Sequence, residues 1–193
     1  AWAVEAAGIY WIGHRQGRAL GRAFALLLQA GAILAWLGHL HAGTEAMISG
    51  PVLGTLLIGL SLLANALSLR MALQDEKNAD CWDANLRPFF NTLGLWFLYL
   101  IAPMVFKAQG TAVAWSLAGL LTVFVGLRLQ ARGWLVNSLI VQLLAGAVFL
   151  LDLRHGGASD AAGVLALAGS GWRGLILASL IGGAALFSVF FAI

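Results

Sequence analysis

Long apolar runs separated by short polar turns dominate the chain. A membrane-spanning helix needs about 20 apolar residues, or somewhat fewer when it is tilted. On that scale the pattern predicts seven spans, at residues 1–13, 19–38, 51–72, 88–106, 112–127, 134–153 and 172–193. The run 160–169 is too short to span and is predicted to be an interfacial or re-entrant helix; the alternative is one long, kinked final helix. The fold class is therefore predicted to be all-α, a polytopic transmembrane helix bundle.

Composition supports a membrane protein over a water-soluble one. Hydrophobic residues make up 61% of the 193 residues, and charged residues only 10%. The net charge of +3 does not point to nucleic acid, because the basic residues lie in short loops between apolar segments. The single cysteine, Cys81, excludes an intrachain disulfide and a cysteine-built metal site.

The basic residues predict the orientation of the chain, because Lys and Arg stay on the cytoplasmic side during insertion. One set of loops holds Arg15, Arg18, Arg22, Arg70, Lys77, Arg87, Arg128 and Arg132. The alternate loops hold only Lys107, Arg154 and Arg173. This asymmetry places residue 1 nearer the outer face of the membrane and residue 193 nearer the cytoplasm.

Two stretches of the chain have similar sequences, one from Ala1 and one from Ala114. At an offset of 113, Ala1, Trp2, Gly13 and Arg15 meet Ala114, Trp115, Gly126 and Arg128. After two extra loop residues, AGAIL from Ala30 meets AGAVF from Ala145, and a weaker match joins the segments from Gly54 and Gly174. The pattern predicts parallel repeats, with a first three-helix unit at 1–72, a loop and linking helix at 73–111, and a second unit at 112–193. The alternative is that apolar helices resemble one another by composition.

Glu5 is the most informative single residue. It lies nine residues before His14, which puts its carboxylate about 13 Å from the inner end of the first helix, near the middle of the hydrocarbon. A carboxylate there must face protein or water, be paired, or be protonated. Asn65, in the middle of the third predicted span, is the expected partner. The functional interpretation is a proton- or ligand-coupled site, and the structural one is a neutral carboxyl hydrogen-bonded between helices.

Other polar residues within the predicted spans are expected to serve helix packing. These are Gln29, Gln142 and Asn91, and the two glutamines fall out of register in the two copies.

The basic turn after the first span carries Arg15, Arg18 and Arg22, which set topology or contact anionic lipid head groups. For metal binding, His39, His41 and His155 are weak candidates, so no metal site is predicted. The sequence contains no recognisable catalytic or cofactor motif, so no cofactor is predicted and enzyme activity is left open, with the balance against it.

The segments AWAVEAAGIYWIGHRQGRALGRAFALLLQAGAILAW, GPVLGTLLIGLSLLANALSLRMAL and NTLGLWFLYLIAPMVF together resemble the domain of unknown function 2339 family, which consists of large predicted bacterial membrane proteins. That family has W-x-x-E-G-type helices followed by a basic turn, and a tryptophan-rich helix where this chain has Leu95 to Tyr99. The chain departs at Ala6 and Ala7, where glycine is expected. The resemblance implies a fragment of a very long inner-membrane protein of a Gram-negative bacterium and assigns no activity. In such a membrane, the orientation predicted from the basic residues puts residue 1 toward the periplasm. A fragment is also expected because both ends lie within apolar segments.

Two functional hypotheses follow. One is transport, or handling of a lipid or envelope precursor, through an intramembrane polar site at Glu5 and Asn65. The other is a non-catalytic scaffold in the cell envelope. The expected partners are the bilayer, anionic lipids, and other envelope membrane proteins or missing parts of the same chain.

Overall fold

The computed structural model describes residues 1–40, 45–73, 81–155 and 183, and every regular element in them is an α-helix. The helices are α1 (Trp2–Arg15), α2 (Ala19–Leu37), α3 (Gly50–Leu73), α4 (Cys81–Val105), α5 (Ala108–Leu129) and α6 (Arg132–His155). The chain divides into two compact units, residues 1–104 and 105–193. Over the described residues, the prediction of an all-α fold is confirmed.

Within the described residues, five helices are long and apolar enough to cross a membrane: α2, α3, α4, α5 and α6. The first predicted span, 1–13, corresponds to α1, which has 14 residues and falls short of that length. Helix α4 begins at Cys81, and its segment of spanning length is Asn85–Val105, which starts three residues before the predicted residue 88. The predicted helix 160–169 and the predicted span 172–193 lie outside the described residues, apart from residue 183.

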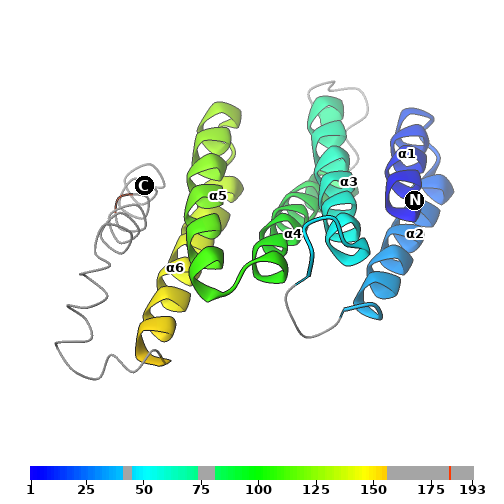
Figure 1. Cartoon of the computed structure of the whole chain (residues 1–193). Coiled ribbons are helices and arrows are strands. Elements are labelled where there is room, and N and C mark those ends of the chain that lie inside the picture. Colours follow the sequence, from blue (N-terminus) through cyan, green and yellow to red (C-terminus); the bar gives the residue numbers. More distant parts are fainter. Residues whose placement is uncertain (41–44, 74–80, 156–182, 184–193) are drawn as a thin grey trace. The chain divides into compact units, whose positions relative to one another are not determined.

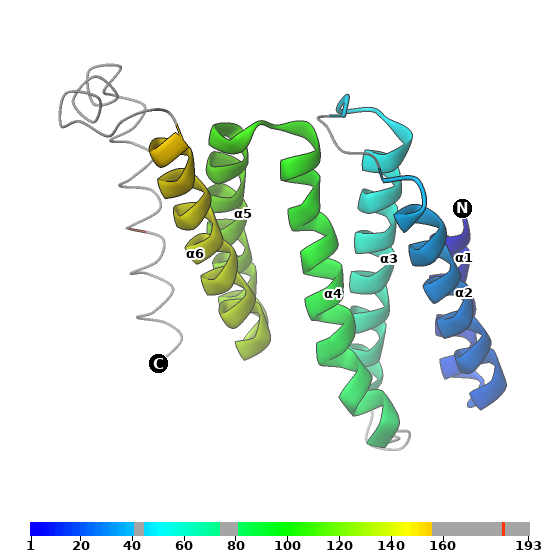
Figure 2. The same cartoon turned by 90° about the horizontal axis from the view of Figure 1, so that it is seen from below.

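The first unit contains α1 to α4. Helices α1 and α2 form an antiparallel hairpin, and α3 packs against both of them (Figure 1). Helices α3 and α4 pack closely against each other (Figure 2). The close approach is shown by Gly59, on which an added Cβ would lie 3.1 Å from the carbonyl oxygen of Gly94. Gly59 and Gly94 let the two backbones approach, and Leu98 of α4 and Leu63 of α3 pack against them.

Aromatic contacts tie the α1–α2 hairpin to α4. Tyr10 and Phe90 meet edge to face with ring centroids 5.4 Å apart, and Trp36 and Phe97 do so at 5.1 Å. All four side chains are buried. Each such pair adds about 0.5–1.5 kcal/mol beyond the area that it buries.

The turn between α1 and α2 is a Schellman motif. The Arg18 N–H donates to the Gly13 carbonyl at 2.9 Å, and the Gly17 N–H donates to the His14 carbonyl at 3.1 Å. Gly17 has a left-handed backbone, with φ of 64°. These bonds satisfy carbonyl groups that the end of α1 would otherwise leave open.

The second unit contains the α5–α6 hairpin, whose turn has the same bonds. The Ala131 N–H donates to the Gly126 carbonyl at 3.0 Å, and the Gln130 N–H donates to the Leu127 carbonyl at 3.2 Å. Gln130 has a φ of 49°, so a glutamine holds the left-handed position in this turn. Each of these residues lies 113 positions after its counterpart in the first turn.

The two extra loop residues expected in the second copy are absent from this turn. Helix α2 begins at Ala19 and helix α6 begins at Arg132, which is again an offset of 113. Gln29 and Gln142 therefore occupy equivalent positions in the two hairpins. The expectation that they fall out of register was wrong. It rested on matching AGAIL with AGAVF, whereas the hydrogen bonds of the two turns are related by an offset of 113.

Candidate functional site

Glu5 lies level with the middle of α2. Near the turn, a Cβ placed on Gly13 would lie 3.1 Å from the backbone nitrogen of Arg22 and 3.2 Å from the carbonyl carbon of Gly21. Glu5 is eight residues before Gly13, and Gln29 is eight residues after Gly21. Because both helices rise about 1.5 Å per residue, Glu5 and Gln29 lie at the same height. Gln29 is close to the midpoint of α2, which is one of the membrane-spanning helices.

Glu5 points away from the interior of the first unit. The buried residues of α1 are Ala3, Ala6, Tyr10 and Gly13, which form one stripe at helical spacing. Glu5 is exposed on the opposite side, together with Val4, Gly8, Trp11 and Ile12. The described residues provide no hydrogen bond or ion pair to its carboxylate.

A buried hydrogen bond crosses the first unit at the same height. The Gln29 side-chain N–H donates to the Ser61 hydroxyl at 3.1 Å, and that hydroxyl donates to the Ile58 carbonyl at 2.8 Å. The Gln29 side chain is only 4% exposed, and its oxygen has no hydrogen-bond partner among the described residues. An unsatisfied buried acceptor costs about 1–3 kcal/mol.

The structure does not join Glu5 to Asn65. Asn65 is 2% exposed and lies in the interior on α3, whereas Glu5 lies on the exposed side of α1. Ser61, one turn before Asn65, is the residue on α3 that bonds to Gln29. Sequence reasoning missed Ser61, although a hydroxyl in the middle of a long apolar helix is a usable signal for an interhelical bond.

The other polar residues predicted within the spans are placed as follows. Gln142 is fully buried between α5 and α6, where its Cγ would lie 2.7 Å from a Cβ placed on Gly119. Asn91 is half-buried on α4. A packing role for Gln142 agrees with this geometry, since it fills the space that a glycine leaves on the facing helix.

The three predicted lipid-contacting arginines lie at one end of the first unit. Arg15 ends α1 and stacks over the Trp11 ring, with its guanidinium carbon 5.0 Å from the ring centroid. Arg18 is exposed in the turn, and Arg22 is half-buried in the first turn of α2. In the second unit, Arg128 stacks over Phe124 in the same way, at 5.4 Å.

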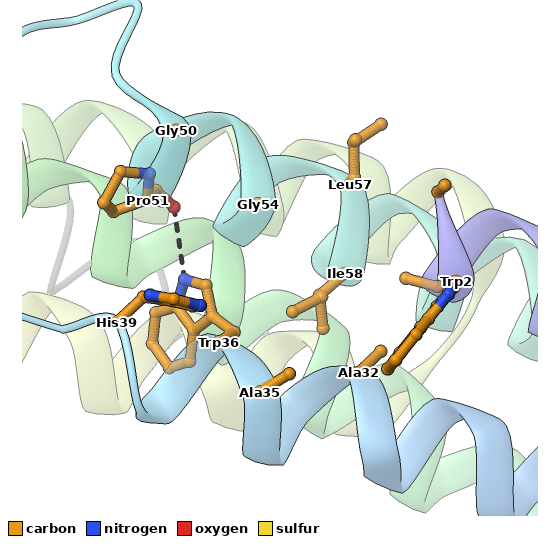
Figure 3. A pocket seen from close by; sticks show the side chains of 12 residues that line it. Trp2, Ala32, Ala35, Trp36, His39, Gly50, Pro51, Gly54, Leu57 and Ile58 are labelled. Carbon is orange, nitrogen blue, oxygen red and sulfur yellow. Dashed lines mark hydrogen bonds between the residues drawn. The ribbon is translucent and has the colours of Figure 1, made fainter.

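A mainly apolar groove of about 660 Å³ lies at the other end of this unit, between the start of α1, the end of α2 and the start of α3 (Figure 3). Trp36 anchors one wall, because its indole N–H is shared between the Thr55 hydroxyl at 2.9 Å and the Pro51 carbonyl at 3.1 Å. His39 lies at the mouth. The groove offers an apolar surface with one imidazole and no carboxylate in its lining.

The metal candidates do not gather within the described residues, which contain no group of three or more His, Cys, Asp or Glu side chains able to hold a metal ion. His39 is exposed after the end of α2. His41 lies outside the described residues, and the side chain of His155 is likewise outside them.

Comparisons with protein-family models, curated proteins and solved structures give no match to this chain. The structure itself defines the class of protein. Five apolar helices of spanning length make the chain a multi-pass membrane protein.

Proposed function

We propose that this protein is a non-catalytic membrane scaffold that docks a helix of another membrane protein. The docking surface is the exposed side of α1, which carries Val4, Glu5, Gly8 and Ile12. Glu5 carries this proposal, because it lies exposed at the height of the middle of α2, a helix of membrane-spanning length. A carboxyl group at that depth is unfavourable against lipid tails and favourable against a hydrogen-bond donor. The partner helix therefore offers such a donor at this height.

The side of α1 that carries Glu5 also suits close contact with a helix. Gly8 lies one turn from Glu5, and a Cβ placed on it would meet nothing within 4 Å. Val4 and Ile12 flank it with about half of each side chain exposed. A small residue between two apolar ones lets a second backbone approach, which is how helices associate in lipid.

Transport, or handling of a lipid or envelope precursor, is the second candidate function. The observation that favours it is the unsatisfied oxygen of Gln29, a buried acceptor at the height of Glu5. Polar groups within the membrane are typical of substrate and proton pathways. On this hypothesis water reaches the exposed side of α1, whereas the scaffold hypothesis requires another protein there.

The experiment places a photo-cross-linking amino acid at Gly8 and, separately, at Leu121, in native membranes. Leu121 is the counterpart of Gly8 at the offset of 113, is 65% exposed on α5, and has Ala118 where the first helix has Glu5. It is thus a matched control for depth and helix face. Cross-linking from each position is then repeated in two variants. Glu5→Gln keeps a side chain that can form hydrogen bonds at residue 5, and Glu5→Leu removes it.

The scaffold hypothesis expects an adduct with a second membrane protein from Gly8 and not from Leu121, retained in Glu5→Gln and lost in Glu5→Leu. An adduct with lipid alone, or one within the same chain, overturns it. Cysteine labelling at Gly8, with Cys81→Ser as background and a membrane-impermeant thiol reagent, tests the second candidate. Labelling in intact membranes supports a water-filled pathway and counts against the scaffold.

We further infer that the α1–α2 and α5–α6 hairpins are copies of one ancestral unit. The support is the shared turn at a constant offset of 113 and the equivalent buried glutamines, Gln29 and Gln142. This helix ending is common in itself, so the support lies in its position, at the same offset that matches Trp2 with Trp115 and Gly13 with Gly126. The extension of each hairpin to a three-helix repeat remains part of this proposal.

The location in a bacterial inner membrane, with the turn between α1 and α2 toward the cytoplasm, is also a proposal. It is supported by the arginines of that turn and by the Arg128 and Arg132 pair at the α5–α6 turn. Membership of the domain of unknown function 2339 family rests on sequence resemblance alone. Cysteine labelling of Gln16→Cys and Gln130→Cys from either side of sealed vesicles tests the orientation.

A further inference from the structure

A second apolar groove, of about 630 Å³, lies at the arginine-bearing end of the first unit. Its walls come from α1, α2 and α4. The lining residues are Tyr10, Ala19, Arg22, Ala23, Leu26, Leu27 and Leu86. Arg22 is the one charged side chain among them, so the groove is a hydrocarbon-lined slot with a guanidinium in its wall.

The groove has the length of an acyl chain within one leaflet. It follows α2 from Ala19, the first residue of the helix, to Leu27, near the middle. Eight residues correspond to about 12 Å along the helix axis. One leaflet of hydrocarbon is about 15 Å deep. Because Ala23 and Leu27 are exposed, the slot opens toward the surrounding lipid.

The charged side chains described near the groove include several arginines. Arg18 lies one turn before Arg22 on the entry to α2 and is exposed. Arg70 in the last turn of α3 and Arg87 near the start of α4 lie at the same end of the unit (Figure 2). The acidic residues between α3 and the first turn of α4 lie outside the side chains that the structure describes; they are Asp75, Glu76, Asp80 and Asp83.

We propose that this groove binds one anionic phospholipid, with an acyl chain along α2 and the phosphate held by Arg22 and Arg18. A guanidinium has five N–H donors, so Arg22 can bind a phosphate in addition to its contacts within the protein. The first turn of α2 has no side-chain cap, so the positive end of the helix faces the same position. This inference is independent of Glu5 and goes beyond the scaffold function.

The test measures lipid retained by the purified full chain in detergent, using native mass spectrometry after exposure to equal amounts of phosphatidylglycerol and phosphatidylcholine. Arg22→Gln and Arg18→Gln each remove one phosphate contact. Ala23→Phe fills the slot without changing charge, and the position is exposed, so the helix core is undisturbed. Arg128→Gln is the control, because Arg128 stacks over Phe124 in the second unit and does not line the groove.

We expect one phosphatidylglycerol retained per chain in preference to phosphatidylcholine, with affinity falling about fivefold for each of Arg22 and Arg18 removed. Ala23→Phe abolishes that retention, and Arg128→Gln leaves it unchanged. The proposal is overturned if Arg128→Gln weakens retention as much as Arg22→Gln, because that is the behaviour of a non-specific charged surface. It is overturned equally if Ala23→Phe has no effect.

Inorganic phosphate distinguishes a lipid site from a simple anion site. If 10-fold excess phosphate does not displace phosphatidylglycerol, the acyl chain contributes to binding, as the groove requires. If phosphate displaces it completely, the apolar slot is not part of the site and the proposal fails. Circular dichroism of each variant confirms that the helices are intact before retention is compared.

Discussion

Gly119 of α5 lies directly against Gln142 of α6. A Cβ placed on Gly119 would lie 2.7 Å from Cγ and 3.0 Å from the side-chain nitrogen of Gln142, and 3.2 Å from Val141 Cγ1. Gln142 is fully buried at this contact. In the first hairpin the position equivalent to Gly119 is Ala6, so the two hairpins use a different residue beneath equivalent glutamines. There the glutamine, Gln29, bonds to α3.

Gly119→Ala is expected to destabilise the second unit by about 1–3 kcal/mol, because a methyl group has no space against Gln142. The measurement is the free energy of unfolding in mixed detergent micelles, followed by circular dichroism. Gly133→Ala on α6 is the control, since its Cβ would meet nothing within 4 Å. Adding Gln142→Ala to Gly119→Ala restores space and recovers part of the loss; no recovery would show that the contact is not the cause.

The first hairpin offers a matched pair of glycines on one helix. Gly13→Ala places a methyl group 3.1 Å from the backbone nitrogen of Arg22, and the backbone cannot move aside as a flexible side chain can. It is expected to cost about 1–3 kcal/mol of unfolding free energy and to separate α1 from α2. Gly8→Ala meets nothing and is expected to be neutral or slightly stabilising. Equal effects of the two substitutions would contradict the close approach at Gly13.

The Gln29–Ser61 hydrogen bond is best measured by a double-mutant cycle. Ser61→Ala leaves the Gln29 amide without its partner and is expected to destabilise the first unit. Gln29→Met, of similar shape, removes the unsatisfied oxygen together with the bond, so the double variant is expected to be at least as stable as the natural chain. The coupling energy should be about 0.6 kcal/mol, as for interhelical bonds in other membrane proteins. A coupling of zero would exclude the bond.

The helices could be predicted from the sequence because length and apolar content decide membrane spans. Helix α1 was less predictable, because its apolar residues lie on every side. Trp11 and Ile12 are exposed and Tyr10 is buried, although all three follow one another in an apolar run. In lipid an exposed apolar side chain costs little, so the run does not show which side packs on α2. The height of Glu5 was therefore predictable, and its direction was not.

The offset that relates the two hairpins was also hidden in the sequence. Matching AGAIL with AGAVF favoured an offset two residues too long in the second helix, since Ala, Gly and Leu recur throughout apolar helices. The geometric signal lies in the turn, where Gly17 marks the left-handed position of the α1–α2 hairpin. Gln130 holds that position in the α5–α6 hairpin, and glutamine gives no sequence signal for a left-handed backbone.

Reciprocal substitutions in the two turns test the offset of 113 between the hairpins. Gln130→Gly relieves a side chain in a left-handed backbone and is expected to stabilise the second unit by about 1 kcal/mol. Gly17→Gln imposes the same strain on the first turn and is expected to cost a similar amount. Both are measured as changes in unfolding free energy, with Gln16→Gly as a control outside the left-handed position. If Gln130→Gly destabilises while Gly17→Gln is neutral, the two turns differ in backbone geometry and the offset of 113 does not relate the two hairpins.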